Sequence, residues 1–290
     1  MIRAQINIRP VIEQDRGKLA NLIHFELYVH RHLDWRPPLD WIGHHPYLIA
    51  EKHGVLMAVL VCPPNHPEIA WIRLFAVSAD LGLHDAWEAL WPVALEQLTN
   101  QGETSIAAIP MMGWFRELLE RSGFSRTTDV ILLRWESNHT LPEPKKLDVL
   151  IRPMNYDDLV NVAEVDSSAF GPVWRNSLDS LKIAYRQVAI ATVAEKEGEM
   201  IGYQISTASP MGGHLARLAV RPQYQKNGIG YALVKDALDQ FKRRGTLRVT
   251  VNTQKDNAVS LSLYLKAGFQ SVGEEYPVYQ YKIDDLVARI

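Results

Sequence analysis

The chain of 290 residues carries the same short segments twice, in the same order and at nearly the same spacing. The matching pairs are Ile8-Arg9-Pro10 with Ile151-Arg152-Pro153, Ala50-Glu51-Lys52 with Ala194-Glu195-Lys196, Arg73-Leu74-Phe75-Ala76-Val77 with Arg217-Leu218-Ala219-Val220, and Gly123-Phe124 with Gly268-Phe269. Their shifts all lie between 143 and 145 residues. Because a fixed period is the signature of repeated structural units, the chain is predicted to contain two copies of one fold.

A polar segment with two prolines separates the two copies. It runs from Asn138 to Lys146 and contains Pro142 and Pro144, which disfavour helix and stiffen an exposed chain. We therefore expect a first domain over residues 1–137, a linker over residues 138–148 and a second domain over residues 149–290. Each domain has enough chain to bury a core of its own.

Composition and charge are those of an ordinary globular protein, with 47% apolar and 22% charged residues. The 31 basic and 33 acidic residues nearly balance, so no basic face for nucleic acid is indicated. The single cysteine, Cys62, cannot form an internal disulfide, and no apolar run approaches the ~18 residues of a membrane span. With no secretion signal at its start, the chain is expected to be cytoplasmic, without nucleic-acid or membrane partners.

The second copy alternates between strand and helix patterns. The expected strands cover residues 150–153, 188–194, 200–207, 215–220, 247–251 and 276–283. The expected helices cover residues 155–165, 230–244 and 257–266, and a loop with a further helix is expected over residues 167–186. This order predicts an α/β (α+β) fold in which a mostly antiparallel twisted sheet is flanked by helices.

The most informative segment is the turn that leads from the strand at 215–220 into the next helix. It contains Gln225, Gly228 and Gly230 in a Gln-x-x-Gly-x-Gly string. The start of a helix exposes unpaired N–H groups and the positive end of the helix dipole, and glycine lets the backbone approach an anion closely. The segment therefore predicts a pyrophosphate-binding turn.

Two well-known nucleotide-binding motifs fit this turn less well. The P-loop of nucleotide hydrolases needs a Gly-Lys pair that is absent here. The dinucleotide fingerprint needs a third small residue where Leu233 stands, and the next strand ends at Asn252 without an acidic residue for a ribose. An ordinary strand-to-helix turn remains an alternative for the two glycines taken alone.

Together with the segment from Asn257 to Phe269, the turn resembles the acetyl-CoA signature of the GNAT N-acetyltransferase superfamily. The resemblance covers about residues 150–284 and includes the strand end Leu218-Ala219-Val220-Arg221-Pro222. It implies two tandem GNAT-like domains and acetyl-CoA as cosubstrate, with no metal. It also implies direct transfer of the acetyl group to a primary amine in a ternary complex, without an acyl-enzyme.

The resemblance further implies roles for individual residues. Backbone groups of Leu218, Ala219 and Val220 would pair with the pantetheine arm, and Asn257 would contact the cofactor through its amide. Tyr264 would protonate the leaving thiolate, as a phenol of pKa ~10 can. The backbone that would hold the pyrophosphate belongs to Gln225, Lys226, Asn227, Gly228, Ile229, Gly230 and Tyr231.

Several of these residues also have plain structural interpretations. Tyr264 could be a core aromatic residue, and Asn257 is also expected to cap its helix. His214 is a weak candidate for the general base, and a surface histidine is the commoner case. Three residues fall where the family places its acceptor site, but they suit packing and surface positions equally well: Phe170, Trp174 and Arg175.

The first copy lacks the cofactor positions. The repeat places Leu119 opposite Tyr264 and Met112 opposite Asn257, and no Gln-x-x-Gly-x-Gly string occurs around Gly82. We expect a degenerate GNAT-like domain that keeps the fold without catalysis. Its histidines match no standard metal-site spacing.

Three functions stay open at this point. The first is an N-acetyltransferase that acts on a small-molecule amine or a peptide N-terminus. The second is a non-catalytic acyl-CoA-binding regulatory module, which would keep the turn without needing Tyr264. The third is transfer of a longer acyl group, which only the pocket volume near the thioester would distinguish from the first.

Overall fold

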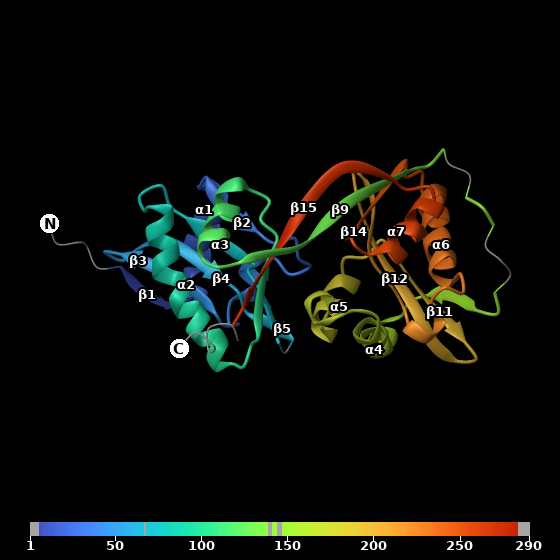
Figure 1. Ribbon diagram of the computed structural model, residues 1–290, viewed down its shortest axis with the longest axis horizontal. Coiled ribbons are helices and arrows are strands. Elements are labelled where there is room, and N and C mark those ends of the chain that lie inside the picture. Colours follow the sequence, from blue (N-terminus) through green and yellow to red (C-terminus); the bar gives the residue numbers. More distant parts are fainter. Residues whose placement is uncertain (1–5, 67, 139–140, 144–146, 284–290) are drawn as a thin grey trace. The chain divides into compact units, whose positions relative to one another are not determined.

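Two structural units make up the chain, and their boundaries differ from those of the sequence repeats (Figure 1). The computed structural model describes residues 6–66, 68–138, 141–143 and 147–283. The first unit comprises Met1–Thr127 with Pro277–Ile290, and the second comprises Thr128–Tyr276.

The first unit contains an antiparallel sheet with the strand order β1-β3-β4-β7-β2. These strands are β1 (Asn7–Pro10), β2 (Tyr28–Arg31), β3 (Tyr47–Lys52), β4 (Val55–Val61) and β7 (Leu74–Val77). Shorter strands follow: β5 (Pro64–His66), β6 (Ile69–Trp71) and β8 (Ser105–Ala108). The helices are α1 (Arg16–Phe25), α2 (Leu83–Asn100) and α3 (Gly113–Arg121).

Side-chain alternation along β3 explains why helices cover both faces of this sheet. Leu48 and Ala50 lie in the cluster that contains buried residues of α2 and α3. Tyr47 and Ile49 lie in the cluster that contains the buried face of α1. Because successive strand side chains point to opposite faces, an uninterrupted apolar strand needs cover on both sides.

The second unit contains a sheet with the strand order β10-β11-β12-β13-β14-β9. Its strands are β10 (Leu150–Pro153), β11 (Ile190–Lys196), β12 (Glu199–Ser209), β13 (Gly212–Val220), β14 (Arg248–Gln254) and most of β9 (Ser125–Glu136). Only the β13–β14 pair of this sheet is parallel. The predicted fold class, with mostly antiparallel sheets flanked by helices, is confirmed.

Helices cover both faces of the second sheet as well. They are α4 (Leu159–Ala169), α5 (Leu178–Tyr185), α6 (Ile229–Arg243) and α7 (Ala258–Lys266). Within this unit α4 and α5 lie on one side of the strands, and α6 and α7 lie on the other (Figure 1).

The loop and second helix expected over residues 167–186 are confirmed. Residues 167–169 belong to α4, a short 3-10 turn covers Pro172–Trp174, and α5 begins only at Leu178. Proline has no amide hydrogen and disfavours helix in the residue before it, so Gly171-Pro172 ends the first helix. The result is a loop over residues 170–177.

Two strands cross from one half of the sequence to the other. β9 ends the first repeat, yet Val130–Glu136 pairs with β14 of the second unit. β15 (Gln270–Lys282) ends the second repeat, yet Tyr279–Lys282 pairs with β8 of the first unit. The units therefore differ from the contiguous boundaries 1–137 and 149–290, because a linker marks a change in composition and does not specify strand partners.

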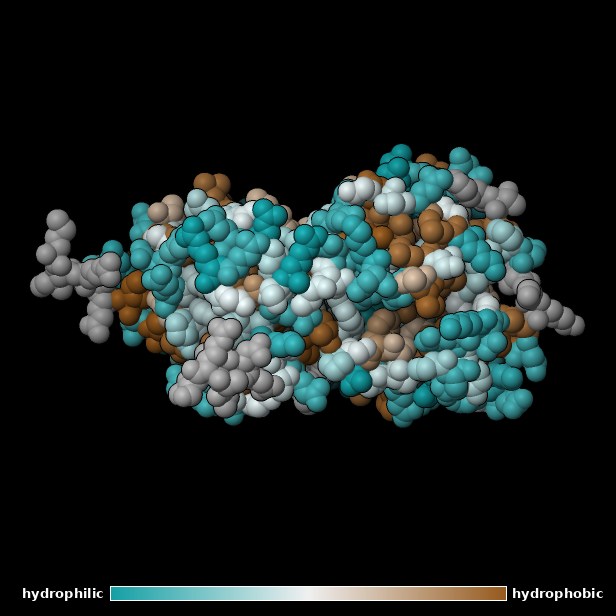
Figure 2. Space-filling view, viewed as in Figure 1, coloured by the Kyte–Doolittle hydropathy of each residue, from teal (hydrophilic) through white to brown (hydrophobic). Residues whose placement is uncertain are grey.

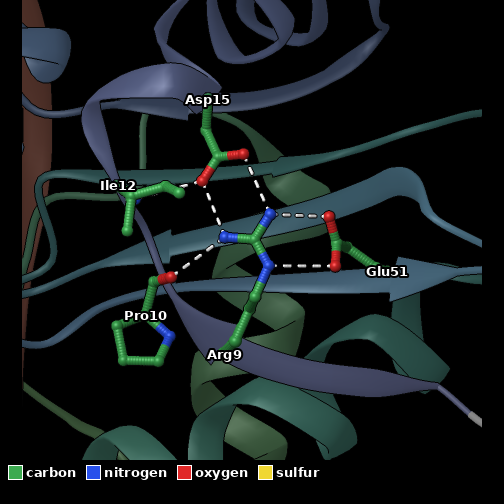
Figure 3. Close-up of polar contacts among 5 residues, drawn as sticks. All are labelled: Arg9, Pro10, Ile12, Asp15 and Glu51. Atoms are coloured by element: carbon green, nitrogen blue, oxygen red, sulfur yellow. Dashed lines mark hydrogen bonds and ion pairs between the residues drawn. The ribbon is translucent and has the colours of Figure 1, made fainter.

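The repeated Ile-Arg-Pro segments build the same ion-pair cluster in each unit. Arg9 donates to Asp15 at 2.7 and 2.9 Å and to Glu51 at 2.7 and 3.0 Å (Figure 3). In the second unit Arg152 donates to Asp158 at the same two distances and also to Glu195. The bond from each arginine holds the pKa of its aspartate below the ordinary value. The repeat found in the sequence is therefore also a repeat of tertiary contacts.

A fragment cut at the linker should not fold. Residues 149–290 lack β9, whose Ile131, Leu133 and Trp135 are buried with α6 and α7 in one core. Burying such side chains contributes roughly 1.5–3 kcal/mol each, which together rivals the 5–15 kcal/mol stability of a typical domain. We expect no cooperative thermal transition by circular dichroism for residues 149–290, and a cooperative one for residues 128–276. Equal melting temperatures of the two fragments would contradict the strand exchange.

Buried histidines predict that acid weakens the first unit. His30 on β2 is 3% exposed and stacks on Phe115 with a 4.0 Å centroid distance, and burial lowers its pKa to about 4. Below pH 6.5 the unfolded histidine, with a pKa of ~6.5, binds a proton, whereas the native histidine stays neutral. The free energy of unfolding therefore decreases as the pH falls from 6.5 towards 4. For His30 the loss between pH 7.5 and 5 is about 2 kcal/mol.

Urea unfolding at these two pH values checks this prediction. His30→Gln should remove about 2 kcal/mol of the pH dependence, whereas His53→Gln, at an exposed turn, should leave it unchanged. If His30→Gln kept the whole dependence, the buried ring would not be its source.

Candidate functional site

The parallel strands β13 and β14 run together at only one end. Gly213–Leu215 pairs with Val249–Val251, and no pairing of these two strands beyond Leu215 occurs among the described residues. The β12–β13 register shifts at this point, so that Ala216 stands opposite no residue of β12. From Ala216 to Val220, β13 therefore keeps β12 on one edge and has an open backbone edge on the other.

The open edge presents polar backbone groups of two predicted cofactor residues. The Arg221 N–H donates to the Ile201 carbonyl at 2.8 Å and so points toward β12. Because backbone groups alternate in direction along a strand, those of Val220 and Leu218 point to the open edge, and those of Ala219 point toward β12. A ligand amide could pair with the first two residues as an added strand does.

The turn after β13 has a run of unpaired amides. The Gln225 N–H donates to Pro222 at 3.2 Å, and the Ala232 N–H donates to Gly228 at 3.0 Å. Between them, the N–H groups from Lys226 through Tyr231 donate no hydrogen bond to any residue that the structure describes. Successive free N–H groups at a helix start form an anion-binding concavity.

Two glycines and one glutamine shape this turn. Gly228 has φ +88°, a conformation that other residues adopt only with strain. A Cβ on Gly230 would lie 3.3 Å from Cδ2 of Leu263, so glycine lets α6 approach α7. The Gln225 Nε2 donates to the Val220 carbonyl at 2.9 Å and ties the turn to the strand end.

The side chains of Tyr231 and Asn257 have structural partners. The Tyr231 hydroxyl donates to the Pro142 carbonyl at 2.7 Å, so its side chain holds the linker while its backbone N–H faces the turn. The Asn257 Oδ1 accepts from the Ser260 N–H at 3.0 Å, which confirms Asn257 as the cap of α7.

Tyr264 lies midway along α7 in the apolar core of the second unit. It is 5% exposed, and its ring meets Phe269 edge-on with centroids 5.6 Å apart. Its hydroxyl makes no hydrogen bond to a described residue. Burial raises the pKa of the phenol above its ordinary value, and the charge of Arg217 acts in the opposite direction. The phenol therefore keeps its proton at neutral pH.

His214, the weak candidate for a base, lies where β13 and β14 are still paired. Its Nδ1 is 2.9 Å from the Thr250 Oγ1, and burial lowers the pKa of the ring. The ring is neutral at pH 7, but it lies at the closed end of the two strands.

Apolar side chains gather on the surface of α7, beside the turn (Figure 2). Val259 and Leu265 are more than half exposed, and Leu263 contacts the position of Gly230. Apolar surface next to free amides suits a ligand that has both a phosphate group and an apolar part.

The sequence analysis missed a buried ion pair at the start of the open edge. Asp166 of α4 is fully buried and accepts two bonds from Arg217, at 2.7 and 2.9 Å. Asp166 follows Val162 and Val165 at helical spacing, so it interrupts the apolar face of α4. A charged residue in the apolar face of this helix is the sequence feature that indicates a buried ion pair.

The first unit repeats the diverging strands but fills the opening. Ile69–Trp71 of β6 pairs in parallel with Ser105–Ala107 of β8. Every residue in these pairs lies 144 positions before its counterpart in the β13–β14 pairs. In the second unit the next part of β13 has an open edge. In the first unit the corresponding edge, that of β7, is occupied, because β2 pairs antiparallel with all of β7. The Ala79 N–H, in the turn before α2, bonds a carboxylate oxygen of Glu26 at 3.0 Å.

Neither a membrane-spanning helix nor a metal site is found among the described residues. No helix among the described residues is long and apolar enough to cross a membrane. Over the same part of the chain, no group of three His, Cys, Asp or Glu side chains could hold a metal ion.

Diverging strands, an open backbone edge and an amide-lined turn make up the candidate site, and similarity to known proteins identifies the class of protein as an acyltransferase. Residues 159–269 match the model of the Acetyltransferase (GNAT) family, and this part of the chain belongs to that family. A solved tandem GNAT protein from the clavulanic acid biosynthesis pathway matches 96% of this chain over 99% of its own, with a TM-score of 0.64 and 13% identity. The two copies predicted from the repeat and the GNAT fold implied by the resemblance are confirmed.

Two curated relatives each match part of the chain. The N-alpha-acetyltransferase RimI of Mycobacterium tuberculosis is 36% identical over 84 residues, which are 28% of this chain and 51% of that protein. The ribosomal protein bS18-alanine N-acetyltransferase of Escherichia coli is 30% identical over 74 residues, which are 26% of this chain and 50% of that protein. The chain thus spans about half the length of these two relatives.

Proposed function

We propose that this acyltransferase moves an acetyl group from acetyl-CoA to a primary amine, and that the second unit performs the reaction. The observation that carries the proposal is the continuity of the open edge of β13 with the free amides of Lys226 through Tyr231 in the turn. A cytoplasmic location without nucleic-acid or membrane partners belongs to the same proposal. It rests on the near balance of charge and on a single unpaired cysteine.

Two parts of the cofactor have matching groups. The amides of the pantetheine arm pair with the backbone of Leu218 and Val220, and the pyrophosphate accepts from the N–H groups of Lys226 through Tyr231. The dipole of α6 adds to this attraction, since its positive end lies at the turn. The Asn257 side chain, which caps α7, is the further cofactor contact in this proposal.

The reaction proceeds by direct attack. A neutral amine adds to the thioester carbonyl, the C–S bond breaks, and the thiolate takes the phenolic proton of Tyr264. The proton released by the amine returns to the phenolate through water, so the products are the amide and free CoA. An acyl-enzyme is not part of the route, because Cys62 is buried in the first unit and burial raises the pKa of its thiol to about 12.

The acceptor is a small-molecule amine or the N-terminus of a peptide. The similarity to the alanine N-acetyltransferases makes a peptide that begins with alanine the first acceptor to test. Because that similarity covers half of those proteins, small amines belong in the same assay.

The first unit has no cofactor role in this proposal. Its own segment from Glu26 to Arg31 takes the place of the ligand: β2 fills the strand edge, and the Glu26 carboxylate bonds a turn amide. The loss of the glycine string and the filled edge together describe a degenerate copy.

Tyr264→Phe should lower kcat about a hundredfold and leave the Kd for CoA within twofold, because only proton donation to the thiolate is removed. The measurement is thiol release with an alanine-initiated peptide and a panel of amines, alongside calorimetric CoA binding. Tyr185→Phe, whose hydroxyl bonds the Met154 carbonyl, is the matched control and should retain activity. An unchanged kcat in Tyr264→Phe would refute the acid role. CoA binding by the wild type without turnover of any amine would favour the regulatory module.

Calorimetry should find one CoA site per chain, and Gly228→Ala should weaken binding at least about tenfold. A side chain at φ +88° strains the turn by roughly 1–2 kcal/mol and shifts its amides. Gly198→Ala, at φ +83° in the β11–β12 hairpin, carries the same strain elsewhere and should bind normally. Two sites per chain would contradict the filled first unit.

A further inference from the structure

Asp166 and Arg217 form the centre of a fully bonded polar cluster. Besides the two bonds from Arg217, Asp166 accepts from the Tyr203 hydroxyl and from the Asn176 N–H, the latter at 2.8 Å. Arg217 is buried apart from 14% of its side chain. The cluster therefore joins α4, β12, β13 and the loop before α5.

The same two side chains hold the loop over residues 170–176 at several points. Arg217 donates to the Trp174 carbonyl at 2.6 Å, and its guanidinium carbon lies 3.6 Å from the centre of the Phe170 ring. Asp166 bonds the Asn176 backbone at the end of the loop. Inside the loop, the Arg175 Nε donates to the Phe170 carbonyl at 2.9 Å.

Arg217 also stands at the reacting end of the open edge. With the pyrophosphate at the turn, the pantetheine arm runs from Val220 toward Ala216, where the two strands close at Leu215. The thioester then lies beside the strand backbone at residues 216–217, while the Arg217 side chain is directed to Asp166 and the Trp174 carbonyl. The phosphates and α6 occupy the other end, so the amine has to approach past the loop that Arg217 holds.

We infer that Arg217 and Asp166 are positioning residues that fix the loop 170–176 against the open edge of β13 and thereby set the affinity for the amine. This inference rests on the proposed function. The pair itself touches neither cofactor nor amine and acts through Phe170 and Trp174.

A second ion-paired arginine in the same unit, partly buried, provides the control. Arg152 is bonded in two-pronged fashion to Asp158 and also bonds Glu195, so it too links a strand to the region where α4 starts. It has no contact with the loop 170–176. A lysine in place of either arginine keeps the charge but loses the paired N–H geometry.

Steady-state kinetics of Arg217→Lys and Arg152→Lys test the inference, with an alanine-initiated hexapeptide and hydroxylamine as acceptors. Hydroxylamine is too small to depend on the loop. In Arg217→Lys the KM for the peptide should rise about tenfold or more, while the kcat/KM for hydroxylamine and the Kd for CoA stay within twofold. In Arg152→Lys the peptide KM, the kcat/KM for hydroxylamine and the Kd for CoA should all stay within twofold of the wild type. This should hold even if the melting temperature of Arg152→Lys falls as much as that of Arg217→Lys.

Hydrogen exchange provides a readout that needs no acceptor. Arg217→Lys should speed exchange of the amides of residues 170–176 about tenfold and leave those of residues 226–231 unchanged. Unchanged exchange in the loop, an unchanged peptide KM, or an equal loss for peptide and hydroxylamine would each overturn the inference. A wild type that binds no CoA would instead refute the proposed function, and the loop exchange would still decide whether the pair positions the loop.

Discussion

The end of the β13–β14 pairing at Leu215 is the constraint on which the site depends. A sheet strand normally satisfies both of its backbone edges. Beyond the irregularity at Ala216, β13 satisfies only the edge toward β12 and offers the other to a ligand. The first unit has the same divergence after Trp71, but β2 completes the edge there. The opening is thus a property of the fold, and the two units differ in what occupies it.

Strand exchange explains why the first half of the sequence is needed by the second. Ile131, Leu133 and Trp135 lie on β9, at the end of the first repeat, and share a core with Tyr264 and α6. In return, the end of β15 pairs with β8. The first repeat therefore supplies part of the core behind the candidate acid.

Local and repeated patterns could be predicted from the sequence, and pairings over long sequence distances could not. The glycine turn, the cap at Asn257 and the two-copy architecture each follow from residues close together or from a fixed period. No local pattern indicates that β9 pairs with a strand of the other repeat, because a strand has the same composition whichever repeat supplies its partner. The residues of β2 likewise carry no sign that they pair with the outer edge of β7. Asp166 was missed since the expected helix boundary fell at residue 165, although its place in the apolar face of α4 marked it.

The buried pair of Asp166 and Arg217 is better explained by placement than by stability. Removing two charges from water costs several kcal/mol per ion, so buried ion pairs often contribute little net free energy of folding. Removing one partner, by contrast, leaves an uncompensated charge and costs about 3–5 kcal/mol. Such a pair tolerates very few alternative arrangements. Because Arg217 bonds both Asp166 and the Trp174 carbonyl, the loop has one favoured position relative to β13. A fixed geometry at the reacting end of the open edge is what amine transfer requires, since the attacking nitrogen must meet the thioester carbonyl in a narrow range of approach.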